Sequence, residues 1–122
     1  MTTYLINHLR IPSGVPKPEG LVYLESVEAT FKPYGGKWLV LDAPVEVLEG
    51  EWPGSAVLME FPDMDTARNW YNSPEYQRIL RLRTDNVISD LVLVDSVSPY
   101  FTSAEWAREI RTDIAAGSDG DS

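Results

Sequence analysis

The chain has 122 residues, a mass of 13.7 kDa and a net charge of −9, from 10 lysines and arginines against 19 aspartates and glutamates. This length favours a single domain, the acidity disfavours a nucleic-acid partner, and no apolar run is long enough to predict a membrane span. The absence of cysteine excludes disulfides and thiolate chemistry, and without a signal-like N-terminus we expect a cytoplasmic protein.

The first half of the chain predicts a strand, a helix and a second strand. Residues 3–11 predict a strand that ends before a proline-rich loop. Apolar residues then recur at helical spacing and predict a helix that ends at Pro33 and the two glycines after it. These apolar positions are Leu21, Leu24, Val27 and Phe31. Residues 37–49 predict one long strand, kinked or bulged at Pro44 and therefore at a sheet edge, because proline cannot donate a ladder hydrogen bond.

The second half predicts the order strand, helix, strand. Residues 55–61 predict the third strand, and residues 87–97 predict the fourth. Asp63 or Asp65 can cap the helix between them, and Ser73 before a proline predicts that this helix restarts. The inner face of the helix comprises Ala67, Trp70, Tyr71, Tyr76, Ile79, Leu80 and Arg83.

The order βαββαβ predicts an α+β, ferredoxin-like fold with a four-stranded antiparallel sheet and both helices on one face. The fourth strand is apolar on both sides: Leu91 and Leu93 point one way, and Ile88, Val92 and Val94 point the other. Because the helices cover only one face, we expect the same sheet of a second subunit to bury the other.

The composition changes after residue 97 and divides the chain into two parts. Residues 1–97 form the predicted α+β domain, and residues 98–122 form a C-terminal extension. Within the extension, residues 103–114 predict a short amphipathic helix, and residues 117–122 predict a disordered acidic tail.

The predicted C-terminal helix has a narrow apolar stripe of Trp106, Ile110 and Ile114, with Thr102 or Ser103 as its cap. A helix this short is marginal on its own in water, and this one lacks the lysine-rich polar face of a membrane-surface helix. We therefore expect it to dock on its own domain or on the partner subunit, and we favour the partner.

Five segments, taken in order, resemble one bacterial family. They are residues 34–37 (YGGK), 47–53 (VLEGEWP), 60–63 (EFPD), 67–76 (ARNWYNSPEY) and 91–95 (LVLVD). Through them, residues 3–97 resemble the domain-of-unknown-function family numbered 1330, in the dimeric α/β-barrel superfamily. The resemblance implies a homodimer whose two sheets face each other and close a barrel. Relatives in that superfamily include cofactor-free monooxygenases, muconolactone-type isomerases, haem-handling enzymes and stress-responsive barrels, so the fold leaves the activity open.

His8, the only histidine, is the first candidate for proton transfer. We place the first strand parallel to the third and antiparallel to the fourth, which brings His8 and Arg10 to the same end of the sheet as Glu60 and Asp90. A histidine–carboxylate pair there could act as a general acid and base, so the predicted catalytic residues are His8, Glu60 and Asp90. The alternatives are a hydrogen-bonded or exposed strand histidine and a paired carboxylate near a sheet end; the strand register decides which side chains share a face.

Aromatic side chains from separate segments, together with one arginine, could line a pocket for a small molecule. The predicted binding residues are Trp38, Trp52, Trp70, Tyr71, Tyr76 and Arg83. The alternatives are ordinary core packing for the aromatic rings and, for Arg83 with Arg78 and Arg81, a solvated helix face. Because Trp52 lies in a Gly-Glu-Trp-Pro-Gly loop, we expect it to fold over the domain or reach the other subunit.

A single histidine without cysteines gives little support for a metal or haem site, and neither a phosphate-binding glycine loop nor a serine nucleophile motif is present. We therefore expect no cofactor. The sequence predicts a small homodimeric enzyme that acts on a small apolar or aromatic molecule, by proton transfer or cofactor-free oxygenation, in a pocket between sheet and helices. The alternative is a non-catalytic ligand-binding or stress-response dimer.

Overall fold

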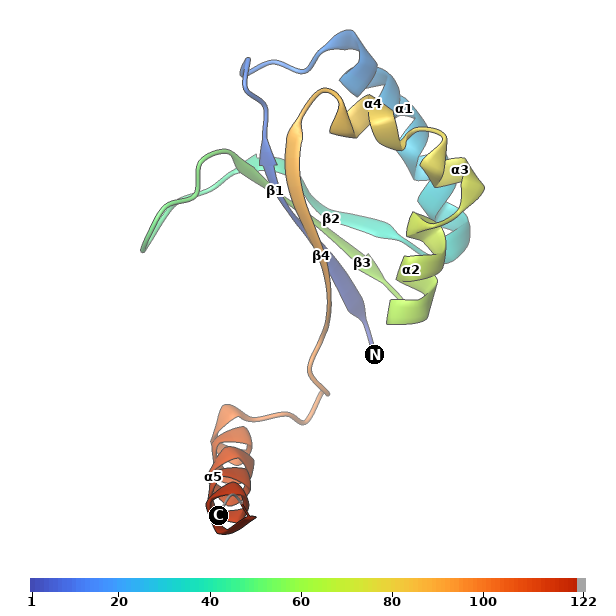
Figure 1. The fold of residues 1–122 in the computed structure, drawn as a ribbon. Helices are drawn as coiled ribbons and strands as arrows, with labels where there is room; N and C mark the ends of the chain where they lie inside the picture. The colour runs from blue at the N-terminus through green and yellow to red at the C-terminus, as the bar shows by residue number, and fades with distance from the viewer. Residues whose placement is uncertain (121–122) are drawn as a thin grey trace.

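A computed structural model describes residues 1–120 and shows one sheet with helices on one face (Figure 1). The strands are β1 (Thr3–Arg10), β2 (Lys37–Pro44), β3 (Ser55–Phe61) and β4 (Ile88–Asp95), in the spatial order β2-β3-β1-β4. The helices are α1 (Pro18–Phe31), the 3₁₀ turn η1 (Lys32–Tyr34), α2 (Met64–Tyr71), α3 (Pro74–Gln77), α4 (Leu80–Thr84) and α5 (Ser103–Gly120). The predicted α+β, ferredoxin-like class is confirmed. None of the helices in this part of the chain combines the length and apolarity that a membrane crossing requires.

Alternation along β1 assigns the two faces of the sheet. Thr3, Leu5 and Asn7 are buried beneath the helices, whereas the residues between them point to the face that no helix covers. The core on the covered face is built from strand and helix residues: Leu5, Val27, Phe31, Met59, Phe61, Ala67, Trp70 and Tyr76. On β4 the exposed side chains alternate with half-buried ones, so the prediction of a fourth strand with two apolar faces is confirmed.

Polar side chains set the start of the two helices that follow β3. The Asp63 carboxylate accepts a hydrogen bond from the Thr66 amide at 2.7 Å, and the Ser73 hydroxyl accepts one from the Tyr76 amide at 3.2 Å. Both predicted caps are confirmed. The helix that restarts at Ser73 is interrupted again, because α3 ends at Gln77 and α4 begins only at Leu80.

β2 is shorter than predicted. It lies at the sheet edge, as expected, but it ends at Pro44, where the missing amide donor closes the ladder, and residues 45–54 form a loop instead of more strand. The irregularity lies before the proline: the pairing with β3 shifts on both sides of Val40, and Asp42 adopts a left-handed backbone with φ 50°.

The predicted direction of β3 is wrong. β1 runs antiparallel to both neighbours, because the crossover through α1 makes β2 parallel to β1 and the loop after β2 then reverses the chain into β3. Glu60 therefore pairs with Tyr4, and His8 pairs with Ala56 on one side and Asp90 on the other. Glu60 lies four residues along β1 from His8, on the order of 13 Å away at the strand rise, and does not share its sheet end.

α1 buries only its C-terminal half. Val27 and Phe31 belong to the core as predicted, whereas Leu21 and Leu24 are exposed. The N-terminal half of α1 borders an opening between helices and sheet that Tyr23 and Leu24 line, and of the two only Tyr23 also packs against the core.

α5 stands apart from the α+β domain (Figure 1). The Thr102 hydroxyl caps it by accepting a hydrogen bond from the Glu105 amide at 3.2 Å. It continues to Gly120, where a disordered tail was expected from residue 117, because the two alanines after Ile114 favour a longer helix; residues 121–122 lie outside the described part. Trp106 touches Phe101 but is 55% exposed, so the apolar stripe is uncovered within this subunit.

Candidate ligand-binding site

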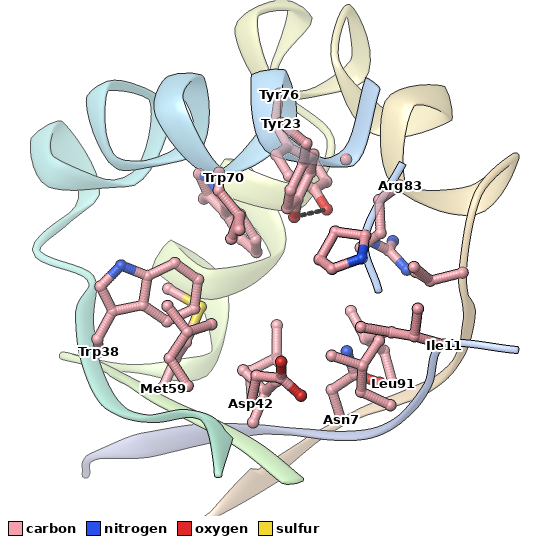
Figure 2. Close-up of a pocket in the computed structure, with 18 residues that line it drawn as sticks. Asn7, Ile11, Tyr23, Trp38, Asp42, Met59, Trp70, Tyr76, Arg83 and Leu91 are labelled. Atoms are coloured by element: carbon pink, nitrogen blue, oxygen red, sulfur yellow. Dashed lines mark hydrogen bonds between the residues drawn. The ribbon is translucent and has the colours of Figure 1, made fainter. Parts of the chain in front are cut away.

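A pocket lies between the sheet and the helices and receives side chains from all four strands and from α1 to α4 (Figure 2). Its volume is about 110 Å³, of the same order as the ~150 Å³ apolar cavity that admits benzene in another protein. Leu24 and Leu41, both exposed, stand at its border. The position between layers of the fold is typical of a small-molecule site.

One side of the pocket is aromatic and firmly held. The Trp70 ring is 1% exposed, lies 4.2 Å from the Tyr76 ring and donates its indole N–H to the Thr30 hydroxyl at 3.0 Å. The Trp38 ring packs edge-on against Phe31 at 5.2 Å between centroids. These contacts fix the two indoles, so this wall is preformed.

The other side of the pocket holds a buried arginine beside two tyrosines. Arg83, from α4, is only 9% exposed, and its Cζ lies 6.0 Å from the centre of the Tyr23 ring. The hydroxyls of Tyr23 and Tyr76 are 2.9 Å apart and hydrogen-bonded. Arg83 therefore does not belong to a solvated helix face, although its neighbour Arg81 is exposed and pairs with Asp85.

Burial and close contacts shift the pKa values of Tyr23 and Arg83 at this side of the pocket. Burial first, and then the neighbouring Tyr76, raise the pKa of Tyr23 above its usual value of 10.0, while Arg83 acts in the opposite direction. For Arg83, burial lowers the pKa, but Tyr76 and Tyr23 together outweigh it and raise the pKa above its usual value. Tyr23 is consequently a neutral hydrogen-bond donor and Arg83 a cation at neutral pH.

Asn7 supplies a polar group from the sheet side. It is 5% exposed, and its Nδ2 donates a long hydrogen bond of 3.4 Å to the Ser89 hydroxyl. Its Oδ1 and the Nε of Arg83 are the buried side-chain polar atoms of residues 1–120 that have no hydrogen-bond partner. Both residues line the same pocket. Unpartnered polar atoms are costly in a protein interior, so their coincidence at one cavity points to a ligand.

The structure brings four of the six predicted binding residues together at this pocket: Trp38, Trp70, Tyr76 and Arg83. Tyr71 lies behind them, 5.5 Å from the Tyr76 ring, and lines an adjoining hollow. Trp52 does not line the pocket; it packs against His8 on the opposite face of the sheet. Asn7 and Tyr23 were missed from the sequence; for Asn7 the signal was its alternation with Thr3 and Leu5 along β1.

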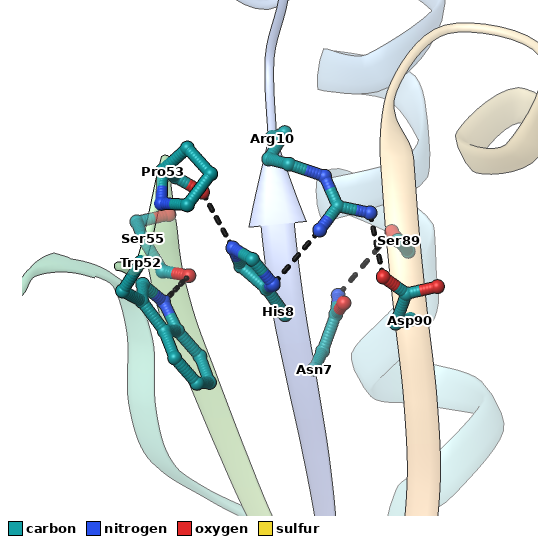
Figure 3. Close-up of polar contacts among 8 residues, drawn as sticks. All are labelled: Asn7, His8, Arg10, Trp52, Pro53, Ser55, Ser89 and Asp90. Carbon is teal, nitrogen blue, oxygen red and sulfur yellow. Dashed lines mark hydrogen bonds and ion pairs between the residues drawn. The ribbon is translucent and has the colours of Figure 1, made fainter. Parts of the chain in front are cut away.

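His8 belongs to a separate polar cluster at the uncovered face of the sheet (Figure 3). Its Nε2 donates to the Pro53 carbonyl, its Nδ1 accepts from Arg10 Nη1 at 2.8 Å, and the Trp52 ring lies 4.3 Å away. Arg10 Nη2 in turn donates to Asp90 Oδ2 at 2.7 Å. This arrangement fastens the 45–54 loop to β1.

The three predicted catalytic residues lie outside the pocket. The hydrogen bond and charge of Arg10 lower the pKa of Asp90, which is an exposed carboxylate paired with Arg10 and linked to His8 through that arginine. Glu60, at the far end of the sheet, lies 4.0 Å from the Lys37 ammonium. Among the described residues, no group of three or more histidine or acidic side chains could hold a metal ion.

Fold and pocket together define a small α+β protein of ferredoxin-like topology with a ligand-sized cavity between its layers. The chain belongs to the family described as Domain of unknown function (DUF1330), whose profile matches residues 2–97. No curated protein matches the chain by sequence.

Solved structures show the same fold at low sequence identity. RPA0582, a protein of unknown function from Rhodopseudomonas palustris, superposes with a TM-score of 0.61 at 19% identity, over 80% of this chain and 84% of that one. SnoaB, a cofactor-independent oxygenase from Streptomyces nogalater, superposes with a TM-score of 0.52 at 10% identity, over 83% and 97% of the two chains. At these identities the likeness concerns the fold alone.

Proposed function

We propose that this protein binds a small organic molecule with a largely apolar body in the pocket between helices and sheet. The observation that carries the proposal is the coincidence of a preformed aromatic wall with the two unpartnered buried polar atoms, on Asn7 and Arg83. An ordinary core would fill this space with side chains and leave no polar atom without a partner.

Turnover of the bound molecule is the second part of the proposal, with molecular oxygen as the oxidant and no metal or organic cofactor. Its support is the likeness of the fold to SnoaB, which is a cofactor-independent oxygenase. The groups at the pocket that can take part in proton transfer include the hydroxyls of Tyr23 and Tyr76 and the carboxylate of Asp42. A catalytic role for His8 or Asp90 would require a second site on the opposite face of the sheet.

We also propose that the protein is a homodimer whose sheets face each other. The uncovered face of the sheet carries an apolar patch on β4: Val92 is 54% exposed, and Ile88 and Val94 on the same strand are exposed as well. An apolar face of this extent on a small domain marks an interaction surface. A second copy offers the same apolar patch, and a two-fold symmetric interface is formed by the same patch on both subunits.

Binding can be tested by native mass spectrometry of protein purified from its own host, followed by calorimetry with any molecule carried along. Leu24→Trp narrows the border of the pocket, and Leu21→Trp places the same side chain on α1 outside the lining. We expect Leu24→Trp to abolish binding and Leu21→Trp to preserve it. Equal binding by both variants would place the ligand elsewhere.

Turnover is tested separately, with an oxygen electrode and metal-free protein. Oxygen consumption that depends on the ligand and is lost in Leu24→Trp supports an oxygenase. Tight binding without oxygen consumption or chemical change of the ligand supports the alternative of a non-catalytic binding protein.

A further inference from the structure

We infer that the ligand of this pocket is a monocarboxylate with an apolar or aromatic body, whose carboxylate binds Arg83 and the Tyr23–Tyr76 hydroxyl pair. The inference rests on the proposed ligand-binding function and specifies the chemical class of the ligand. Its starting point is a buried cation that no carboxylate of the described chain neutralises.

Arg83 is the arginine whose charge lies inside the protein without an anionic partner. The ion pairs among residues 1–120 involve Arg10, Lys32, Lys37, Arg68 and Arg81, but not Arg83. A buried charge without a counter-charge is unfavourable, and the neutral side chains of Tyr23 and Tyr76, including the Tyr23 ring at 6.0 Å, compensate it only in part because neither supplies a negative charge at neutral pH. A carboxylate supplies both the missing charge and the planar pair of acceptors that a guanidinium fits.

The two tyrosines add a donor at the same place. Their hydroxyls are 2.9 Å apart, so one O–H is used between them and the second remains for a ligand oxygen. Because Tyr23 is neutral and buried, this donor does not repel an anion. The Arg83 guanidinium and one tyrosine hydroxyl together form a binding corner for an oxyanion.

The remaining lining sets the shape of the ligand. Figure 2 shows Trp38 and Met59 on the side of the pocket away from Arg83, so an apolar body extends toward the indoles while its carboxylate meets Arg83. The Asn7 amide lies on the sheet side and can bond a further polar substituent. Asp42 also lines the pocket. Its carboxylate, together with the net charge of −9 on the chain, disfavours a second negative group on the ligand.

The test compares carboxylates with their uncharged carboxamides, which have almost the same size and shape. Benzoate and benzamide, and cinnamate and cinnamamide, are titrated into the intact protein by calorimetry. We expect each carboxylate to bind at least about tenfold more tightly than its carboxamide. Arg83→Met should abolish this preference, with the affinity for each carboxylate falling to that for its carboxamide or below. Arg81→Met, which removes the same charge two residues away on the exposed side of α4, should preserve it.

The outcomes separate the two proposals. Equal affinity of carboxylate and carboxamide for the unmodified protein, with both lost in Leu24→Trp, overturns the inferred carboxylate and leaves the pocket as the binding site. A preference that survives Arg83→Met also overturns it. Absence of any binding to the unmodified protein at millimolar concentration overturns the inferred carboxylate as well, whereas the proposed binding function fails only if the carried-along ligand binds Leu24→Trp as tightly as the unmodified protein. The comparison on the unmodified protein decides the question even if a variant fails to fold.

Discussion

Asn7 and His8 are consecutive residues of β1 that serve opposite faces of the sheet. Asn7 is buried at the pocket beneath the helices, whereas His8 holds the 45–54 loop on the uncovered face. The pleat of one strand therefore separates a ligand-binding side from the side that we propose for dimerisation. Substitutions on the two sides should have separable effects, and the predictions below use this separation.

Replacing Arg83 with methionine should stabilise the free protein. The substitution removes a buried charge without an ion-pair partner and keeps an apolar side chain of similar length, so we expect a gain of about 1–2 kcal/mol in the free energy of unfolding. Urea denaturation measures it. Arg81→Met, at an exposed position, should change stability by no more than about 0.5 kcal/mol. A marked loss of stability in Arg83→Met would show that the protein itself satisfies the guanidinium.

Replacing His8 with alanine should loosen the loop without affecting the pocket. The change removes the hydrogen bonds to Arg10 and to the Pro53 carbonyl and the contact with Trp52, at a cost of about 1 kcal/mol. Amide hydrogen exchange of residues 45–54 should become faster, and ligand affinity should change less than about twofold, since the site lies across the sheet. A large loss of ligand affinity or turnover in His8→Ala would contradict this prediction and show that His8 acts in binding or catalysis.

Asn7 and Arg83 also mark the limit of what the sequence could predict. Local sequence pattern was enough to predict the order of helices and strands, the caps Asp63 and Ser73 and the two apolar faces of β4. The structure confirms all three. The inward position of Arg83 was predicted from its helical spacing to Tyr76, Ile79 and Leu80. That its guanidinium would have no carboxylate partner does not follow from spacing, because it depends on the side chains that the other elements bring to the pocket.

The relation between His8 and Glu60 shows a second limit. Both residues are placed correctly in their strands, but whether two strands meet at one end depends on their direction, which the chain connections set and residue spacing does not. Because the direction of β3 was predicted wrongly, Glu60 was expected beside His8, whereas it lies at the far end of the sheet. In the same way, the burial of Asn7 depends on the parity of β1, which only the pairing with both neighbours fixes.

Alkaline pH should destabilise the protein through Tyr23. Its pKa in the folded state is raised, mainly by burial, whereas the unfolded chain loses the tyrosine proton as the pH passes 10.0. Above that pH the folded state binds more protons than the unfolded state, so the free energy of unfolding falls as the pH rises. Below pH 10.0 this contribution is fully present. Urea denaturation between pH 8 and pH 11 should show a shallower fall for Tyr23→Phe than for the unmodified protein, whereas Tyr100→Phe, at a 91% exposed position, should leave the slope unchanged.

A charge at Val92 should separate the proposed dimer. Val92→Asp places a carboxylate in the middle of the apolar sheet face, where a facing sheet would have to desolvate it. Light scattering should report about twice the chain mass of 13.7 kDa for the unmodified protein and a single chain for this variant. Val22→Asp, an equivalent change on the exposed side of α1, should leave the mass unchanged. A monomeric unmodified protein at micromolar concentration, with its fold intact, would refute the dimer.

Truncating Trp106 should weaken the dimer and free the C-terminal helix. In this subunit α5 stands apart from the domain and its stripe of Trp106, Ile110 and Ile114 is uncovered, so the surface that can bury it is the partner subunit. Removing the largest ring of the stripe should raise the dissociation constant of the dimer about tenfold. It should also expose α5 to limited proteolysis while the α+β domain remains folded, because the core contains no residue of α5.

The matched control for this last substitution is Arg108→Ala, which shortens an exposed side chain of the same helix off the apolar stripe. It should change neither dimer dissociation nor protease sensitivity. If Trp106→Ala makes α5 sensitive to protease without weakening the dimer, α5 docks on its own domain in solution. If it changes neither property, the stripe contacts nothing, and the stability of α5 comes from its own helical sequence.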